Sequence, residues 1–128
     1  MENTLFLVIP CYNEEEVLNE TARRLSEKMN ALIGSGKISE NSRICFVNDG
    51  SKDKTWEIIK NLNAENNIFI GINLSRNRGH QNALLAGLMT VKGECDAAIS
   101  LDADLQDDID AIDEMTELGM IHPGTKII

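Results

Sequence analysis

Short apolar runs alternate along the chain with longer stretches whose apolar positions recur at helical spacing. The runs are typical of strands buried on both faces of a sheet, and they fall at Leu5–Pro10, Arg43–Asn48, Ile68–Leu74 and Ala97–Leu101. The helical spacing predicts helices over Glu14–Ile33, Lys54–Asn63, Asn82–Val91 and, more weakly, Ile109–Leu118. Strict alternation of strands and helices predicts an α/β fold, with a mainly parallel sheet and helices on both faces.

Two of the helices have candidate start signals. Asn13 is available as the N-cap of the first helix, and Glu14–Glu16 would then occupy its first turn, where the helix dipole favours acidic side chains. Asp53 is the corresponding candidate N-cap for the second helix. These signals predict that the first helix begins at Glu14 and the second directly after Asp53.

The length of 128 residues suits one domain, which we expect to span residues 1–128. Ile127 and Ile128 begin another apolar run at the end of the chain, so the predicted sheet is incomplete there. We therefore expect the chain to be the N-terminal part of a longer protein. An incomplete sheet exposes the edge of a strand, which favours a homo-oligomer.

Acidic side chains outnumber basic ones by 21 to 12, which gives a net charge of −9. A chain this acidic is a poor candidate for binding nucleic acid, whereas an acidic cluster that binds a divalent cation becomes of interest. No apolar run approaches the roughly 18 residues of a membrane helix, and Met1–Pro10 lacks the features of a signal peptide. Cys11, Cys45 and Cys95 are widely spaced and odd in number, so we expect reduced thiols in a soluble cytoplasmic chain.

Polar residues follow each predicted strand, at the edge of a parallel sheet where ligands bind. These segments are Pro10–Glu14, Asn48–Ser51, Ser75–His80 and Asp102–Asp108. Because the strands are predicted to be parallel, all of these segments should face the same edge. Their convergence is the main indication of a functional site.

Asp102 and Asp104 are separated by one residue, so in an extended segment their side chains point the same way. Two neighbouring carboxylates repel each other unless a cation lies between them or one is protonated. Mg²⁺ or Mn²⁺, bound by carboxylate and diphosphate oxygens, would resolve the repulsion. The alternative is that these acids solvate a loop and cap the following helix, but the other polar segments at the same edge favour the cation.

Single residues at this edge each have two interpretations. Asp49 could accept hydrogen bonds from a nucleobase or ribose, or it could form a turn with Gly50. Tyr12 could stack on a base, or it could cover the sheet edge. Glu14 could accept hydrogen bonds from a ligand, or it could favour a helix start.

This edge carries one close pair of arginines. Arg76 and Arg78 lie beside a predicted helix start, which suggests a phosphate, although ion pairs with nearby acids are equally consistent with the sequence. His80 could donate to a phosphate or hydroxyl, or it could be a structural residue at the helix start.

Taken together, these segments resemble the family 2 inverting glycosyltransferases, which have the GT-A, or nucleotide-diphospho-sugar transferase, fold. The matching sequence segments are VIPCYNEEEVL (8–18), FVNDGSKDKTWEII (46–59), LSRNRGHQNALLAGL (74–88) and ISLDADLQDD (99–108). Within this family, the residues of these segments are most similar to those of the bacterial polyprenyl-phosphate (bactoprenol) glycosyltransferases, which are relatives of dolichol-phosphate mannose synthase. The resemblance spans the chain to about residue 115.

The resemblance implies specific roles. A nucleotide pocket would be lined by Pro10, Tyr12 and Glu14, and the base and ribose would be held by Val47 and Asp49. The DxD element, which carries out catalysis and binds the metal, would be formed by Asp102, Ala103 and Asp104. The phosphates would be approached by Arg76 or His80, and the sugar by Gln106.

The implied reaction is transfer of a hexose, glucose by subgroup likeness, from a UDP-sugar to undecaprenyl phosphate with inversion. A divalent metal, Mg²⁺ or Mn²⁺, held by Asp104 with Asp102 nearby, would stabilise the leaving diphosphate. The acceptor phosphate is already ionised at neutral pH and needs little help from a base. The full-length protein would act at the cytoplasmic face of the membrane, with its acceptor half and membrane helices beyond this chain.

Departures from the family pattern keep other functions open. Asp107–Asp110 stands where the family commonly has prolines, and the likeness fades after Met115. The chain could therefore be a non-catalytic module that binds a nucleotide sugar and a metal, or a transferase that uses GDP-mannose or another acceptor. A signalling receiver domain fits poorly, because no convincing lysine follows a late strand and the Arg76–His80 segment has no role in it.

Overall fold

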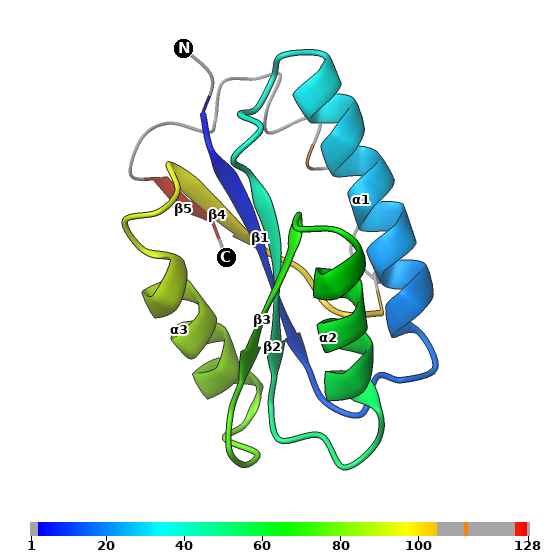
Figure 1. Cartoon of the computed structure of the whole chain (residues 1–128). Helices are drawn as coiled ribbons and strands as arrows, with labels where there is room; N and C mark the ends of the chain where they lie inside the picture. The colour runs from blue at the N-terminus through cyan, green and yellow to red at the C-terminus, as the bar shows by residue number, and fades with distance from the viewer. Residues whose placement is uncertain (1–2, 105–111, 113–124, 128) are drawn as a thin grey trace.

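The computed structural model describes residues 3–104, Ile112 and residues 125–127. The described elements are, in chain order, β1 (Leu5–Cys11), α1 (Leu18–Gly34), β2 (Arg43–Asn48), α2 (Thr55–Glu65), β3 (Phe69–Asn73), α3 (His80–Val91), β4 (Ala97–Ser100) and β5 (Thr125–Ile127). Strands and helices alternate as predicted (Figure 1), so the α/β assignment is confirmed.

The strands form one sheet in the order β3-β2-β1-β4-β5, and each neighbouring pair is parallel. β1 is the central strand: Val8 pairs with Cys45 of β2 on one side and with Ser100 of β4 on the other. The predicted apolar run at the end of the chain forms β5 beside β4. The sheet is therefore parallel throughout its described strands.

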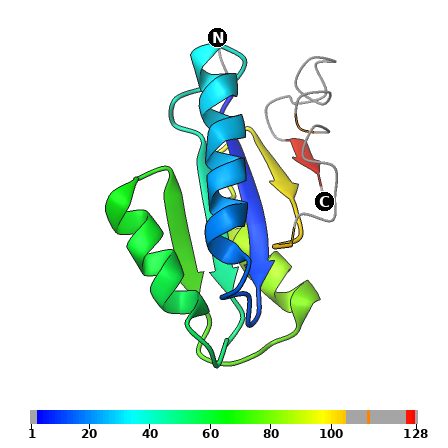
Figure 2. The same ribbon diagram turned by 90° about the vertical axis from the view of Figure 1, so that its right-hand side faces the viewer.

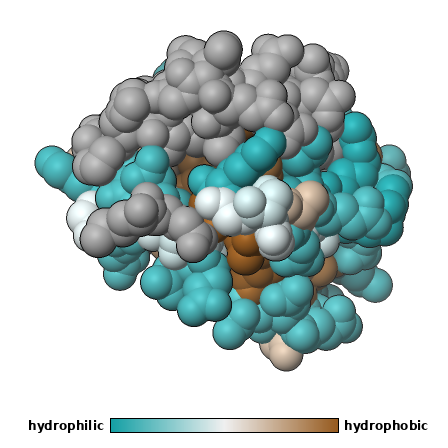
Figure 3. Space-filling model, turned by 90° about the horizontal axis from the view of Figure 1, so that it is seen from above, coloured by the Kyte–Doolittle hydropathy of each residue, from teal (hydrophilic) through white to brown (hydrophobic). Residues whose placement is uncertain are grey.

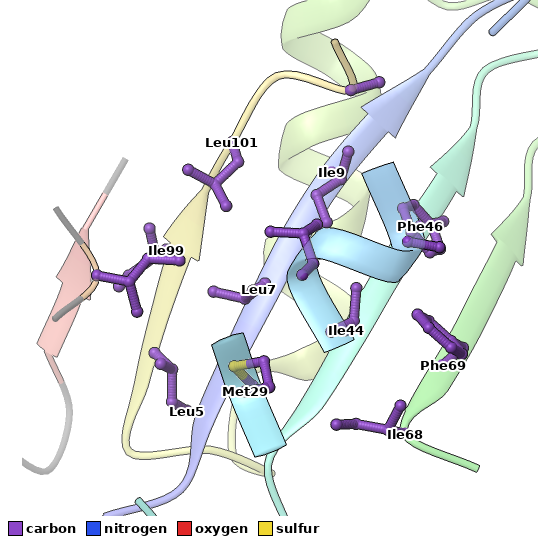
Figure 4. Close-up of a cluster of buried hydrophobic side chains, with 14 of the residues drawn as sticks. Leu5, Leu7, Ile9, Met29, Ile44, Phe46, Ile68, Phe69, Ile99 and Leu101 are labelled. Carbon is purple, nitrogen blue, oxygen red and sulfur yellow. The ribbon is translucent and has the colours of Figure 1, made fainter. Parts of the chain in front are cut away.

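The two faces of the sheet are covered by different helices (Figures 1 and 2). Leu5, Leu7 and Ile9 of β1 belong to the hydrophobic cluster under α1 and α2, where Met29 of α1 also packs (Figure 4). The intervening Phe6 and Val8 belong to a second cluster, under α3. Both sets are buried, as the continuous apolar run of β1 predicts for a strand covered on both faces.

α3 lies unusually close to the sheet because of a glycine. A Cβ atom at Gly87 would lie 2.6 Å from a methyl carbon of Val8 and 2.8 Å from one of Val47. Real Cβ atoms do not approach other atoms so closely, so the helix could not keep this position with a side chain there. The absence of a side chain at Gly87 thus sets the distance between α3 and strands β1 and β2.

The largest difference from the predicted elements is at the start of α1. The helix begins at Leu18 and not at Glu14, and Asn13 is not its N-cap. Asn13 adopts a positive φ of 53°, and the main-chain NH groups of Val17 and Leu18 both donate to the carbonyl of Glu14, which closes a turn. α3 differs in the opposite sense, because it begins at His80, two residues before the predicted start. The predicted helix at 109–118 lies largely outside the described residues.

The strands begin at one end of the molecule, and all their carboxyl ends point to the other (Figure 1). Seen from the end where the strands begin, hydrophilic residues cover most of the coloured surface, with hydrophobic ones visible between them (Figure 3). Among the described residues, no helix combines the length and apolar composition needed to cross a bilayer.

Candidate functional site

The strand order reverses at β1 and β4, and a crevice lies beyond the carboxyl ends of these two strands. From β1 the chain proceeds through α1 to β2 and through α2 to β3, all on one side of β1. It then returns through α3, on the opposite face, to β4 on the other side of β1. Open parallel sheets bind ligands at such a reversal of strand order, beyond the carboxyl ends of the strands.

A cavity of about 290 Å³ lies at this reversal. Its described lining consists of Pro10, Cys11, Tyr12, Glu14, Asp49, Asn77, Gly79, His80, Asp102, Ala103 and Asp104. Every polar segment predicted to follow a strand therefore contributes to the same cavity. The predicted convergence at one edge of the sheet is found in the structure.

Most of the residues singled out in the sequence line this cavity, but Val47, Arg76 and Arg78 are not part of its described lining. The side chain of Val47 is fully buried in the core under α3, so only its main chain could touch a ligand. Arg76 and Arg78 are exposed. Gln106 lies outside the described residues. Asn77 and Gly79 also line the cavity, although the sequence analysis assigned no individual role to either residue.

Cys11 also lines the cavity. Its thiol is 1 % exposed and its Sγ donates to the carbonyl of Ile9 at 3.4 Å. Burial raises the pKa of this thiol far above its ordinary value, and the nearby Glu14 acts in the same direction. Cys11 is therefore a neutral wall of the cavity and not a nucleophile.

The loop after β1 is held by the loop after β2. The main-chain NH of Asn13 donates to Oγ of Ser51 at 2.9 Å, and Oδ1 of Asn13 accepts from the NH of Lys52 at 2.8 Å. The NH of Glu14 donates to Oγ1 of Thr55 at 2.8 Å. These bonds place Tyr12 and Glu14 on either side of an anchored residue, with their side chains at the cavity.

Thr55 is the most deeply buried residue of this network. It is fully buried, and both its main-chain NH and its hydroxyl donate to Oδ1 of Asp53, at 2.9 and 2.5 Å. The other carboxylate oxygen of Asp53 accepts from the NH of Glu15 at 3.2 Å. The N-cap of α2 is Lys54 and not Asp53 as predicted, but the carboxylate of Asp53, one residue earlier, binds both the start of α2 and the first loop.

Asp49 connects β2 to the loop before α3. It is 3 % exposed, and its Oδ1 accepts from the NH of Arg78 at 2.6 Å. The side-chain amide of Asn77 donates to the carbonyl of Asp49 at 3.2 Å. Asp49 therefore organises the 76–79 loop in addition to lining the cavity.

Gly50 permits this close contact between the two loops. Its φ is +66°, and a Cβ atom there would overlap the main-chain nitrogen of Asn77. Only glycine combines this conformation with so close an approach of another backbone. The Asp-Gly pair read as a turn signal in the sequence thus fixes the position of a neighbouring loop.

The acidic segment, residues 102–104, forms the wall of the cavity beyond β4. Ala103 is 3 % exposed and belongs to the core under α1, whereas Asp102 is half-buried and Asp104 is exposed. The hydroxyl of Thr21 on α1 donates to the carbonyl of Ala103 at 2.5 Å. The central residue of the segment is thus anchored inward while both carboxylates line the cavity.

Negative charge accumulates across the cavity. The pKa of Glu14 is raised above its ordinary value by desolvation, and then by the negative charges of Asp104, Asp53 and Asp102. Glu14, Asp102 and Asp104 line the same cavity, so repulsion between their like charges adds to the effect of desolvation on this pKa. A cation between them would relieve the repulsion.

The donor set fits a hard divalent ion that also binds phosphate. Mg²⁺ keeps several waters and takes one or two carboxylates together with substrate phosphates. Asp102 and Asp104 at the cavity wall supply such a pair. Among the described residues, no group of three or more His, Cys, Asp or Glu side chains could hold a metal ion by itself. Asp102 and Asp104 thus fit a metal ion only as a pair of ligands, with the remaining positions left to water or phosphate oxygens.

The sequence of this chain is similar to those of known transferases. The glycosyl transferase family 2 model matches residues 6–118. YkoT of Bacillus subtilis, described as an uncharacterized glycosyltransferase, is 47% identical over 124 residues, which are 97% of this chain and 36% of YkoT. The prophage bactoprenol glucosyl transferase homolog of Escherichia coli K12 is 38% identical over 114 residues, which are 87% of this chain and 34% of that protein.

A solved structure gives the same fold. The crystal structure of S. aureus TarS 1-349 superimposes with a TM-score of 0.65 at 18% identity, over 89% of this chain and 31% of that one. This likeness supports the GT-A fold predicted from the sequence. The present chain spans about a third of the length of the curated relatives it matches. On the family match and the identity to these relatives, the chain belongs to glycosyltransferase family 2.

Proposed function

We propose that the chain is the donor-binding part of an inverting glycosyltransferase that transfers a hexose, glucose, from a UDP-sugar to a polyprenyl phosphate. The observation that carries this proposal is the cavity between β1 and β4, which is lined by an aromatic residue, acids from three loops and a helix start. The names of two relatives support the acceptor: the bactoprenol glucosyl transferase homolog, and the undecaprenyl-phosphate 4-deoxy-4-formamido-L-arabinose transferase of Aeromonas hydrophila, 36% identical over 115 residues.

The residues on the β1 and β2 side of the cavity would bind the nucleoside. Tyr12 is 42 % exposed, so its ring is available to stack on a base. Asp49 would accept hydrogen bonds from the base or ribose with the part of its carboxylate that is not bonded to Arg78. Pro10 and the main chain of Val47 would complete this side.

The residues on the other side would bind the diphosphate. His80 lies in the cavity as the first residue of α3, where the positive end of the helix dipole favours an anion. Asp102 and Asp104 would hold a divalent ion, Mg²⁺ or Mn²⁺, which supplies positive charge to the diphosphate as it departs. Arg76 and Gln106 remain proposed contacts to the phosphates and the sugar.

The proposed acceptor needs little activation by this part of the protein. A lipid phosphate is ionised at neutral pH, so its oxygen attacks the anomeric carbon without first losing a proton. Inversion follows when that attack comes from the face opposite the diphosphate. The protein would work at the cytoplasmic face of a membrane, with the acceptor bound by residues outside the described part of the chain.

A second candidate is a domain that binds the donor but does not transfer the sugar. It is consistent with the described cavity, because every role proposed for its lining concerns the donor. We expect residues 1–128 to fold as one donor-binding domain in either case. GDP-mannose is the alternative donor.

Calorimetric titration tests the donor site. We would titrate the chain with UDP and with GDP, each with and without Mn²⁺, and compare an Asp102→Ala/Asp104→Ala variant. The matched control is Glu57→Ala/Glu65→Ala, which removes two exposed carboxylates from α2, away from the cavity. Mn²⁺-dependent UDP binding that is lost only in the first variant supports the proposal. Folded protein that binds neither nucleotide contradicts the proposal. Tighter binding of GDP than of UDP would contradict the UDP-sugar donor and favour GDP-mannose.

A further inference from the structure

We propose that Thr21 of α1 is a positioning residue for the acidic segment, and that its hydroxyl fixes how the carboxylates of Asp102 and Asp104 face the cavity. This inference rests on the proposed donor site and assigns a role to a residue outside the cavity lining. Thr21 acts on the ligands through the main chain of Ala103.

The hydrogen bond joins parts of the chain that are distant in sequence. Oγ1 of Thr21, near the start of α1, donates to the carbonyl oxygen of Ala103 at 2.5 Å, across 82 positions of sequence. Both ends are buried, because Thr21 and Ala103 are each 3 % exposed. A hydrogen bond that is buried at both ends contributes more to local order than the same bond at the surface.

Thr21 stands out among the buried positions of its helix. The other buried residues of α1 are apolar and lie on the same face: Leu18, Ala22, Leu25, Met29 and Leu32. A valine or alanine at position 21 would continue this apolar face. A buried hydroxyl requires a partner, and the partner here is the central residue of the acidic segment.

The acidic segment lies where the support of the sheet ends. β4 ends at Ser100, which pairs with Val8, and the NH of Leu101 donates to the carbonyl of Val8 at 3.2 Å. Ala103 follows two residues later, beyond the ladder. The bond from Thr21 therefore extends the anchoring of the chain to the position between the two carboxylates.

The direction of the carboxylates follows from this anchoring. Residues 103 and 104 lie in a turn after β4 and not in the extended segment that the sequence suggested, so strand alternation does not set where these side chains point. Ala103 points into the core under α1 and its carbonyl is bound by Thr21, while Asp102 and Asp104 line the cavity. Without the hydroxyl, the buried carbonyl would lack this partner, and the segment would have to shift toward water to satisfy it.

The expected effect is a loss of metal-dependent binding. Removing a group that orients metal ligands without contacting the metal itself typically weakens metal affinity about 10- to 100-fold. Thr21→Val keeps the shape of the side chain and removes the hydroxyl, so we expect Mn²⁺-dependent UDP binding to weaken about tenfold. We expect UDP binding without Mn²⁺ to change little, because Tyr12 and Asp49 belong to other loops. Thr21→Ser keeps the hydroxyl and should keep the wild-type affinity.

The test measures the UDP dissociation constant with and without Mn²⁺ for wild type, Thr21→Val and Thr21→Ser. The matched control is Thr90→Val, which removes another threonine-to-carbonyl bond, 2.7 Å to Ala86, from the exposed face of α3. The ratio of the two dissociation constants is decisive, because a purely structural defect alters both constants together. If Thr21→Val does not fold, Thr21→Cys, of similar size and a weak donor, takes its place.

A reduced Mn²⁺ effect in Thr21→Val that Thr21→Ser restores and Thr90→Val lacks supports the inference. Equal Mn²⁺ effects in wild type and Thr21→Val overturn it and leave the proposed function intact. A parallel loss with and without Mn²⁺ overturns it as well, because Thr21 would then support only the fold. Wild type that shows no Mn²⁺-dependent binding overturns the proposed function, and this inference with it.

Discussion

The two walls of the cavity are held in different ways. The wall after β1 is bound to the loop after β2 through several hydrogen bonds, which are exposed at Ser51 and Asp53 and buried at Thr55. The wall after β4 is anchored from the core, through the burial of Ala103 and its bond to Thr21. We therefore expect the first wall to tolerate the loss of a single exposed hydrogen bond. In both walls, substitutions that remove a buried hydrogen bond or add atoms at a close backbone contact should lower stability more.

The largest effect is expected at Gly50, where the first wall meets the loop before α3. Gly50→Ala places a Cβ against the main chain of Asn77 and strains a φ of +66°. We expect unfolding free energy to fall by about 3 kcal/mol, since overpacking adds to the strain of a left-handed residue. We also expect UDP binding to be lost. Urea denaturation and calorimetry measure the two effects.

Gly36→Ala is the matched control for Gly50→Ala. Gly36 also has a positive φ, of 77°, but no atom lies within 4 Å of the position that an alanine methyl group would occupy there. Gly36→Ala should therefore lower the free energy of unfolding by only about 1 kcal/mol, the cost of a left-handed backbone conformation, and should keep UDP binding. Equal losses in the two variants would show that the contact with Asn77 is not closed in solution.

The next effect is expected at the buried centre of the first wall. Thr55→Val removes the acceptor for the NH of Glu14 and the donor to Asp53 while keeping the shape of the side chain. Two lost bonds predict a fall of about 2 kcal/mol in the free energy of unfolding. Thr55→Ser should recover most of it in the same urea titration. An unchanged free energy of unfolding in Thr55→Val would mean that the stability of this wall does not depend on its buried hydrogen bonds.

A smaller effect is expected for an exposed bond of the same wall. Ser51→Ala removes the acceptor for the NH of Asn13, which lies at the surface where water can replace it. We expect a loss of about 0.5 kcal/mol and unchanged UDP affinity. A loss as large as that of Thr55→Val would remove the distinction between buried and exposed bonds in this wall.

The smallest effect depends on pH and on the charge that faces the other wall. The pKa of Glu14 is raised in the folded chain by desolvation and by the acids opposite, so its ionisation costs stability. In metal-free buffer, Glu14→Gln should be slightly more stable than wild type at pH 7. This advantage should shrink as the pH falls through the raised pKa and vanish below the ordinary glutamate pKa. Urea denaturation across pH measures it, and a pH-independent difference would contradict repulsion as its cause.

Local patterns predicted the elements well, except where contacts between distant segments decide the backbone. The runs of apolar residues located the strands to within a residue or two. The start of α1 was missed because Asn13 bonds to Ser51 and Lys52 and not to its own helix. Local sequence carries no signal of such distant partners.

The candidate site could be predicted as a set of loops but not as a geometry. Parallel strands bring their carboxyl ends together, so the convergence followed from the fold class. The placement of β4 beside β1, and therefore of Asp104 opposite Glu14, depends on strand order, which local patterns do not encode. Thr21 gave no signal in the sequence, since threonine at a helical core position reads as a small tolerated residue.

The pairing of β1 with β4 has a consequence for the order of folding. Leu5 pairs with Ala97, more than 90 positions further along the chain, whereas β1–β2 and β2–β3 join segments that are much closer in sequence. Pairings between distant segments form slowly, because a long loop must close first. We expect the half of the sheet that carries Tyr12 and Asp49 to be assembled first, and the acidic pair to reach the cavity only when β4 docks. Metal binding would then report the last step of folding.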